Sequence, residues 1–477
     1  MTKRFYITTT LPYINAPLHL GHAVEIIRAD AIARYKKLQG YDVFFNTGTD
    51  EHGKKIYEAA EKIGSDVQSY IDEYANLFKE TVKKFGVLKE GEGIHFTRTT
   101  DQKHIGFAKN FWKRCLKNGY IYKKNYQTKY CVGCEEEKTD SELTDGKCPI
   151  HNTVSDLIDE ENYFFKYSAF EEKLLEFYNN NPDFIVPKSR MNEMEQFIKR
   201  GLRDFSISRL KSKMSWGIEV PEDHEHVMYV WFDALTDYLS TLGDDENIEK
   251  YWKNGTPTQY CGKDNTRFQG LMWQAMLMAA GYPNTNQIVV NGFILGEGGV
   301  KMSKSLGNTI DPLSIVDEYG VDALRYFALR EFHPFEDTAV SKDSLKESYN
   351  GNLANGIGNL TSRIMKMVES HIEDLYMPEP NEFPKDYKDN FEKFDIYRVC
   401  QIIWHEINEL DKKIQEEEPF KVVKQDKVRG VKIIKELVDK LNYISILLKP
   451  ILPETSEKIE KCIENNNMPV EPLFLRK

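Results

Sequence analysis

The start of the chain alternates short apolar runs with a longer periodic stretch. Phe5-Tyr6-Ile7-Thr8-Thr9 predicts a buried strand, and Tyr41 to Phe45 predicts a second one. Between them, residues 20–38 carry apolar side chains at helical spacing on one face, namely Val24, Ile27, Ala31 and Tyr35. Strand, helix and strand within about forty residues form a βαβ unit, which predicts a parallel sheet.

The pattern changes twice further along the chain. The segment 119–223 is rich in tyrosine and in short strand-like runs, which indicates an insertion. Signals of α/β type return at residues 228–232 and 287–290. We therefore predict an α/β domain made of residues 1–118 and 224–300 and split by the insertion.

The carboxyl-terminal part of the chain is predicted to be all helical from about residue 341. One apolar face is formed by Ile433, Ile434, Leu437, Val438, Leu441, Ile444 and Leu448. Pro450 should end that helix, because proline has no backbone N–H to continue it. Residues 301–340 then form a connecting segment, and residues 341–477 a separate helical domain.

Composition limits the class of protein. The net charge of −11 over 477 residues argues against a surface that coats nucleic acid along its whole length. The chain has no apolar leader after Met1 and no run of about 18 apolar residues, so we expect a cytoplasmic protein outside the membrane. Seven cysteines, an odd number, do not form the disulfide framework of a small secreted domain.

Three cysteines and a histidine follow the spacing of a metal site. Cys131, Cys134, Cys148 and His151 read C-x2-C-x13-C-x2-H. Two such pairs of thiolate and imidazole ligands suit tetrahedral zinc, and four protein ligands close the coordination sphere. The pattern predicts one structural zinc ion; the alternative is a set of free structural thiols.

A first candidate phosphate-binding element is His19-Leu20-Gly21-His22, at the start of the predicted helix. A helix amino terminus offers unpaired N–H groups and a positive dipole end, which favour anions. Gly21 allows a phosphate to approach the backbone, and the imidazoles can donate hydrogen bonds to it. The alternative is that both histidines are ordinary helix caps.

A second candidate phosphate-binding element is Lys301-Met302-Ser303-Lys304-Ser305. It follows the glycine-rich run Gly296-Glu297-Gly298-Gly299 and precedes Leu306-Gly307-Asn308. A loop of this composition can close over a pyrophosphate in the transition state and then open to release it. The alternative is a solvated surface loop.

The two elements together resemble the H-x-G-H and K-M-S-K-S signature of class I aminoacyl-tRNA synthetases, which activate an amino acid as its adenylate. The resemblance implies a Rossmann-like parallel-sheet catalytic domain, a connective insertion with a zinc knuckle, and an all-α anticodon-binding bundle. It implies that His19 and His22 stabilise the reacting phosphates and that Lys301 and Lys304 hold the pyrophosphate. ATP with Mg²⁺ would also be bound by Asn15, Gly21, Gly262, Asp264, Ser303 and Lys304.

Three further stretches resemble methionyl-tRNA synthetases. They are Leu11-Pro12-Tyr13-Ile14-Asn15, Thr47-Gly48-Thr49-Asp50-Glu51-His52-Gly53 and Val230-Trp231-Phe232-Asp233-Ala234-Leu235. Acids that follow a strand of an open α/β sheet lie where such sheets bind ligands, and a carboxylate there can pair with an ammonium group. The resemblance implies a methionine pocket lined by Leu11, Tyr13, Asp50, Trp231, Ala234, Tyr238 and Gln269.

The run after Gly262-Lys263-Asp264 departs from that family. Asp264 matches the residue expected to bind the ribose hydroxyls. Asn265 replaces the usual aliphatic residue, Gln269 replaces the usual pocket histidine, and Trp273-Gln274 replaces the usual Trp-Pro. The amide of Gln269 can still offer a hydrogen bond to the ligand.

Recognition of tRNA is predicted in the helical domain. Residues 352–360 with Arg363 resemble the helix that reads the anticodon, so Asn359 and Arg363 would contact base edges. Phe420 replaces the usual tryptophan and can still stack on a base. Residues 421–440 hold seven basic and three acidic side chains, which form either a phosphate-binding face or a solvated one.

The function predicted from the sequence is ATP-dependent attachment of methionine to tRNA(Met) during protein biosynthesis. The alternatives are another small class I synthetase, a nucleotidyltransferase that acts on small metabolites, and a catalytically impaired tRNA-binding paralogue. The chain ends at Lys477, soon after the helical domain, so we expect a monomer without an appended dimerising domain.

Overall fold

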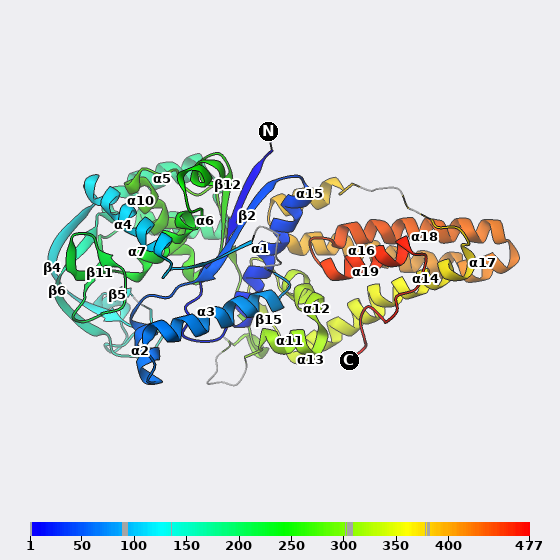
Figure 1. The fold of residues 1–477 in the computed structure, drawn as a ribbon, viewed down its shortest axis with the longest axis horizontal. Helices are drawn as coiled ribbons and strands as arrows, with labels where there is room; N and C mark the ends of the chain where they lie inside the picture. The colour runs from blue at the N-terminus through cyan, green and yellow to red at the C-terminus, as the bar shows by residue number, and fades with distance from the viewer. Residues whose placement is uncertain are drawn as a thin grey trace. The chain divides into compact units, whose positions relative to one another are not determined.

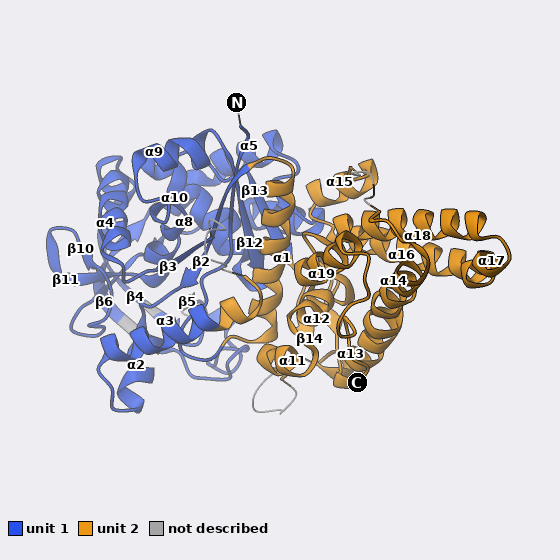
Figure 2. Cartoon of the chain, turned by 45° about the vertical axis from the view of Figure 1, so that its right-hand side comes forward, with its two compact units in different colours: residues 1–17, 42–80, 90–290 blue, residues 18–41, 81–89, 291–477 orange. Residues whose placement is uncertain are grey.

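The computed structural model describes residues 2–87, 94–134, 136–300, 302, 309–376, 378 and 382–477. The chain divides into two compact units (Figure 2). Unit 1 consists of Met1–Pro17, Asp42–Glu80 and Glu90–Val290, and unit 2 of Leu18–Tyr41, Thr81–Lys89 and Asn291–Lys477. Unit 2 therefore contains residues 18–41 and 81–89, which the sequence assigns to the catalytic domain, together with the predicted helical domain.

Unit 1 is built on a six-stranded sheet, of which β2 and β12 are labelled in Figure 1. The order of its strands is β3-β2-β1-β12-β13-β7. Its strands are β1 (Arg4–Thr8), β2 (Asp42–Thr49), β3 (Ile94–Arg98), β7 (Ile185–Val186), β12 (Thr256–Gly262) and β13 (Gln287–Asn291). β1 pairs in parallel with both β2 and β12, so that Thr8 lies beside Asn46 and Gln259. The predicted parallel sheet is confirmed.

The strands of this sheet are more extensive than the apolar runs alone indicate. β2 continues to Thr49, so that the first three residues of the T-G-T-D-E-H-G run belong to the strand and only Asp50 onward follows it. β3 was not predicted, because only Ile94 and Phe96 on it are apolar. β7 lies within the predicted insertion but pairs with β13 of the main sheet.

The core of unit 1 is rich in large aromatic side chains. Trp112, Trp252 and Trp273 are essentially fully buried. They belong to α4 (Gln102–Lys117), η3 (Ile248–Lys253) and α10 (Trp273–Ala280). Burial of each such ring stabilises the fold by about 2–3 kcal/mol, which anchors the helices against the sheet. Other α-helices with residues in unit 1 are α2 (Lys54–Lys62), α3 (Val67–Lys84), which continues into unit 2 at Thr81, α5 (Glu171–Asn180), α6 (Lys188–Lys199), α7 (Val230–Ala234), α8 (Asp237–Ser240) and α9 (Asp245–Asn247).

Two small antiparallel sheets account for the strand-like runs of the insertion. One has the order β5-β4-β6-β8 and is dominated by the long pair β4 (Ile121–Cys131) and β6 (Asp156–Phe165), with β5 (Glu136–Lys138) and β8 (Phe205–Ser206) beside them. The other contains β9 (Ser208–Leu210), β10 (Glu219–Val220) and β11 (Asp223–Met228). The run 228–232 is not one strand, because β11 ends at Met228 and α7 begins at Val230.

Unit 2 joins α1 (Leu20–Leu38) to the carboxyl-terminal helices. These are α11 (Pro312–Tyr319), α12 (Val321–Tyr326), α13 (Lys342–Ser348), α14 (Asn359–His371), α15 (Lys385–Glu392), α16 (Ile396–Glu417), α17 (Pro419–Gln425), α18 (Lys427–Leu448) and α19 (Pro453–Glu464). Two short strands, β14 (Ile294–Leu295) and β15 (Thr338–Ala339), pair in parallel. The predicted apolar face of α18 is buried, and the helix ends at Leu448, just before Pro450.

Buried arginines fix α1 within unit 2. The guanidinium of Arg28 donates hydrogen bonds to four backbone carbonyls of residues 328–334 and to Oδ1 of Asn291. Arg325 donates to Oδ2 of Asp30 at 2.6 Å and to two carbonyls at residues 450–451. Because a buried charge is stable only when it is paired, these contacts hold the helix that begins after His19 in one position.

Candidate active site

The carboxyl ends of β1 and β2 bring two predicted pocket segments together in unit 1. Tyr13 and Asp50 form an isolated parallel bridge, and the backbone N–H of Asp50 donates to the carbonyl of Pro12 at 3.1 Å. Asp50 is only 4% exposed. The β1–β2 register therefore places a buried carboxylate beside the Leu11–Tyr13 segment.

A second contact ties the Asp50 turn to α7. Nδ1 of His52 lies 2.8 Å from Oδ2 of Asp233, and both side chains are buried. Asp233 is on the same short helix as the predicted pocket residues Trp231 and Ala234. This close contact thus connects segments that are far apart in the sequence.

The predicted aromatic residues lie on α7 and α8. The indole of Trp231 stacks on Phe268, with ring centroids 3.8 Å apart and planes at 4°. Nε1 of Trp231 has no hydrogen-bond partner among the described residues. Tyr238 is buried, and its carbonyl accepts a hydrogen bond from the hydroxyl of Tyr6 at 2.9 Å.

Gln269 lies close to the pocket segment and is fully buried. Its Nε2 donates to Oγ1 of Thr10 at 3.1 Å, directly before Leu11. The contacts described so far connect six predicted pocket residues, either directly or through an adjacent residue in the sequence. They are Leu11, Tyr13, Asp50, Trp231, Ala234 and Gln269. Tyr238 follows Ala234 along the chain on α8.

A buried charge cluster behind α7 was missed in the sequence. Nε2 of His104 lies 2.7 Å from Oδ1 of Asp233, and its Nδ1 is 3.8 Å from Asp237. Burial raises the pKa of Asp237 to about 6. Burial alone would also raise the pKa of Asp233, but the two histidines hold it below its usual value. No spacing rule joins His104 to Asp233, because they are 129 residues apart.

A separate cavity of about 760 Å³ lies next to this cluster in unit 1, since His104 belongs to both. Its lining includes His95, Thr97, His104, Ser240 and Asp244. None of the predicted methionine-pocket residues lines this cavity. It is therefore distinct from the Tyr13–Asp50 edge of the sheet.

The predicted ribose-binding segment lies at the carboxyl end of β12. Gly262 is the last residue of that strand, and Asp264 is exposed in the 3₁₀ turn Lys263–Asn265. A Cβ atom at position 262 would lie 2.8 Å from Oδ1 of Asp264. Glycine therefore allows the Asp264 carboxylate to fold back against the strand end.

In unit 2, His19 and His22 occupy the amino terminus of α1. Nδ1 of His19 accepts from the N–H of Gly21 at 3.1 Å, and Nδ1 of His22 accepts from the N–H of His19 at 3.3 Å. The two rings stack with centroids 3.6 Å apart. Burial and the neighbouring His19 hold the pKa of His22 well below its usual value. Both histidines are thus helix caps, as the alternative interpretation held.

The cap bonds also set the chemistry of both rings. A ring nitrogen that accepts a backbone N–H carries no proton, so each neutral imidazole has its proton on Nε2. Capping and phosphate binding are therefore compatible, because each ring accepts through one nitrogen and donates through the other. Asn15 lies exposed before this helix. Lys301, Ser303 and Lys304 lie outside the described residues.

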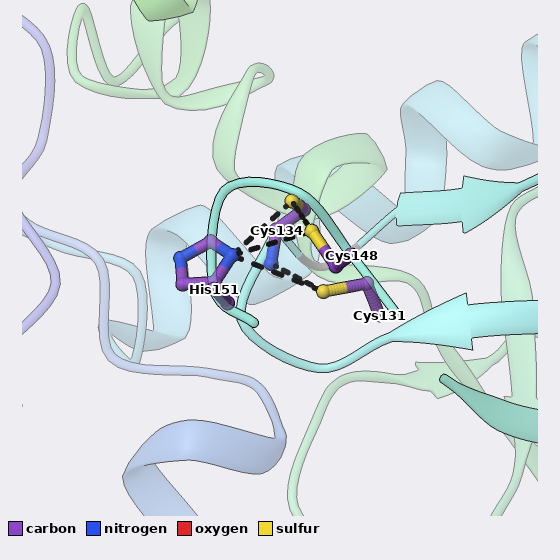
Figure 3. Close-up of side chains that lie close together, drawn as sticks. All are labelled: Cys131, Cys134, Cys148 and His151. Carbon is purple, nitrogen blue, oxygen red and sulfur yellow. Dashed lines mark hydrogen bonds between the residues drawn. The ribbon is translucent and has the colours of Figure 1, made fainter. Parts of the chain in front are cut away.

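The predicted metal ligands converge in the insertion (Figure 3). The ligand atoms of Cys131, Cys134, Cys148 and His151 all lie within 4.8 Å of one another. Nδ1 of His151 is 3.4 Å from the sulfur of Cys134, which is 3.5 Å from that of Cys148. Gly133 is required at the turn, since a Cβ there would lie 2.4 Å from the His151 ring. These four side chains can hold one metal ion.

The predicted anticodon residues lie on two helices of unit 2, Asn359 and Arg363 on α14 and Phe420 on α17. Asn359 is exposed at the start of α14, and Phe420 on α17 is 44% exposed. Arg363 forms an ion pair with Asp411 on α16. In the basic stretch, Lys421, Lys427 and Lys440 each pair with a glutamate, which accounts for part of its positive charge.

Comparison with known proteins identifies the family. The model of class I tRNA synthetases (M) matches residues 5–156 and 133–365. A methionine–tRNA ligase of Caldanaerobacter subterraneus is 40% identical over 96% of this chain and 74% of its own length, and that of Thermosynechococcus vestitus is 39% identical over 96% and 90%. The chain belongs to the methionyl-tRNA synthetases.

Solved structures of methionyl-tRNA synthetases support the same assignment. The Mycobacterium tuberculosis enzyme in complex with methionyl-adenylate matches with a TM-score of 0.88 and 35% identity, covering 96% of this chain and 93% of that one. Its apo form matches with a TM-score of 0.83 and 31% identity, covering 100% and 99%. The helices that the structure describes include none long and apolar enough to span a bilayer.

Asp237 gives a testable pH dependence of stability. Its folded-state pKa of about 6 exceeds the ordinary value of 3.8, so the folded chain binds this proton more tightly than the unfolded chain. Its contribution to stability is therefore complete below about pH 4 and is lost as the pH rises through about 6. Relative to wild type, Asp237→Asn should gain on the order of 2 kcal/mol of unfolding free energy between about pH 4 and pH 8.

The measurement is urea unfolding of both proteins across that pH range. Asp245→Asn, at an exposed position, is the matched control and should follow the wild-type curve. Parallel curves for wild type and Asp237→Asn would contradict the raised pKa.

Proposed function

We propose that this chain attaches methionine to its tRNA through a methionyl-adenylate, with release of AMP and pyrophosphate. Membership of the methionyl-tRNA synthetases supports this function. The observation in this chain that carries it is the link between the Asp50 turn and α7, made by the His52–Asp233 pair. That link holds the buried carboxylate of Asp50 near the aromatic side chain of α7. A ligand with an ammonium group and an apolar side chain needs both groups in one pocket.

The amino acid is held by residues of unit 1. The carboxylate of Asp50 pairs with the ammonium group of methionine, an interaction strengthened by its burial. Trp231 and Tyr238 pack against the thioether, which favours polarizable aromatic surroundings. Leu11, Tyr13 and Ala234 complete the apolar lining. Gln269 is proposed to act at the same pocket.

The phosphates of ATP are held by His19 and His22. Their Nε2–H groups donate to phosphate oxygens as charge develops there, and the amino terminus of α1 adds its dipole. The carboxylate of methionine attacks the α-phosphorus, forming the acyl–phosphate bond as the bond to pyrophosphate breaks. No protein side chain needs to act as a nucleophile. Asn15 and Gly21 would contact the nucleotide, and Gly262 and Asp264 the ribose.

Lys301 and Lys304 are proposed to neutralise the leaving pyrophosphate, and Ser303 to contribute to ATP binding. Mg²⁺ bound with ATP would supply further neutralisation of the phosphate charge. We also propose that the protein acts as a cytoplasmic monomer. All bonds that form and break are in the substrates. The protein therefore accelerates the reaction by positioning the substrates and stabilising the charge that develops.

We propose that the Cys131–His151 cluster binds one structural Zn²⁺. Tetrahedral zinc with sulfur at about 2.3 Å and nitrogen at about 2.1 Å requires sulfur–nitrogen separations of about 3.6 Å, close to the 3.4–3.9 Å between the sulfurs and Nδ1 of His151. The four ligands leave no position open for a substrate. The ion therefore supports the turn between β4 and β6 rather than the phosphate chemistry.

The direct test of function is ATP–pyrophosphate exchange with each of the twenty amino acids. We expect label exchange with methionine alone, and a loss of about 100-fold in kcat for His22→Ala, since it removes one donor to the phosphates. Exchange with cysteine instead would favour another class I synthetase. Exchange with none would favour the impaired tRNA-binding paralogue.

Removal of the metal should act locally. Elemental analysis should find one zinc per chain. Chelation should abolish amide hydrogen-exchange protection between β4 and β6, while part of the ATP–pyrophosphate exchange activity is retained. Cys134→Ser should reproduce that loss of protection. Unchanged protection of the insertion after chelation would contradict the structural role.

Phe420 is proposed to stack on an anticodon base. Phe420→Ala should raise the KM for tRNA by about tenfold, because one stacked base contributes about 1–3 kcal/mol. ATP–pyrophosphate exchange should be unchanged. Leu475→Ala, which removes another exposed apolar side chain of unit 2, is the control. An equal loss in both assays would refute the anticodon role.

A further inference from the structure

Three glutamines and a threonine form a buried polar chain behind the predicted methionine pocket in unit 1. Gln259 is on β12, Gln269 on η5 (Phe268–Met272), Gln274 on α10, and Thr285 precedes β13. Each is at most 1% exposed. Buried amides are costly unless hydrogen-bonded, so the direction of every bond in this group matters.

The hydrogen bonds run in one direction. The hydroxyl of Thr285 donates to Oε1 of Gln259 at 2.6 Å, and Nε2 of Gln259 donates to Oε1 of Gln269 at 3.2 Å. Nε2 of Gln269 then donates to Oγ1 of Thr10 at 3.1 Å. Reversal of the Gln259 amide would place its oxygen against Oε1 of Gln269, and reversal of the Gln269 amide would place its N–H groups against those of Gln259. The orientations of the three side chains are therefore coupled.

Gln274 fixes the first hydrogen bond of this series, the one from Thr285 to Gln259. Its Nε2 donates to Oγ1 of Thr285 at 3.0 Å, so the single hydroxyl proton of Thr285 must point to Gln259. Its Oε1 accepts from the N–H of Thr285 and from Nδ2 of Asn284, both at 3.1 Å. The same Nε2 also donates to the carbonyl of Gln269 at 2.8 Å. Gln274 thus sets both the direction of the chain and the backbone position of Gln269.

The other end of the chain reaches the substrate segment. Thr10 follows β1 and directly precedes Leu11, and its hydroxyl donates to the carbonyl of Tyr260 at 3.4 Å. Two residues further, the carbonyl of Pro12 accepts the N–H of Asp50. The position of Thr10 therefore affects the positions of both Leu11 and the Asp50 carboxylate, which are proposed to bind methionine.

We propose that Gln259, Gln269, Gln274 and Thr285 are positioning residues that set the affinity for methionine by holding Thr10 and the segment after it. This inference rests on the proposed function. It reassigns Gln269: the amide does not contact the ligand but holds the backbone that does. The departures at positions 269 and 274 are then one coupled change, since Gln274 donates both to the carbonyl of Gln269 and to Thr285, whose hydroxyl leads through Gln259 to the Gln269 side chain.

Thr285 is the most direct position at which to test this, because among the described residues its side chain forms hydrogen bonds only with Gln259 and Gln274. Thr285→Val keeps the shape but removes the hydroxyl that directs the chain. In ATP–pyrophosphate exchange we expect the KM for methionine to rise about tenfold, with the KM for ATP and kcat within about twofold of wild type. Thr285→Ser retains the hydroxyl and should restore wild-type values.

A second variant breaks the chain one link nearer the pocket. Gln259→Glu still accepts from Thr285, but its carboxylate cannot donate to Gln269, so the same selective rise in the KM for methionine is expected. Gln196→Glu, which adds the same charge at an exposed position of α6, is the control and should leave both KM values unchanged.

The outcomes separate this inference from general loss of structure and from the proposed function. Equal rises in the KM values for methionine and ATP, or a lower Tm with an unchanged KM for methionine, would overturn the positioning role. If Thr285→Val does not fold, Gln259→Glu decides by the same criteria. A wild-type chain that exchanges no label with methionine would overturn the proposed function, and this inference with it.

Discussion

The parallel register of β1, β2 and β12 is the constraint on which the proposed methionine site depends. Because Thr8 lies beside both Asn46 and Gln259, the three strands end at the same edge of the sheet. The segments that follow them carry Leu11, Asp50 and Asp264. A shift of one residue in either pairing would turn alternate side chains to the other face of the sheet and separate these segments.

Buried polar contacts then convert this edge into a defined site. Asp233 receives His52 on one side and His104 on the other, which fixes α7 against the Asp50 turn and against α4. The amide chain from Thr285 to Thr10 does the same for the segment after β1. Such groups are costly when unpaired, so each network has one low-energy arrangement. Stability and the shape of the site come from the same contacts.

Local patterns in the sequence were sufficient to predict strands β1 and β13, helices α1 and α18, and the Cys131–His151 cluster, because each depends on periodicity or close spacing. They did not predict β3, which has few apolar residues, or the end of β2, where Thr47 and Gly48 resemble a turn. The His104–Asp233 pair and the Gln259–Gln269–Gln274 chain were also missed. Their members are ordinary polar residues until the sheet brings them together.

The central claim is that methionine binds at the carboxyl edge of the sheet, between Asp50 and the aromatic side chains of α7 and α8. A crystal structure of the protein with methionine and a non-hydrolysable ATP analogue tests it most directly. The account predicts the ammonium group within hydrogen-bonding distance of Asp50 and the thioether against Trp231. Methionine in the 760 Å³ cavity beside His95 and Ser240, with the Asp50 edge unchanged, would contradict it.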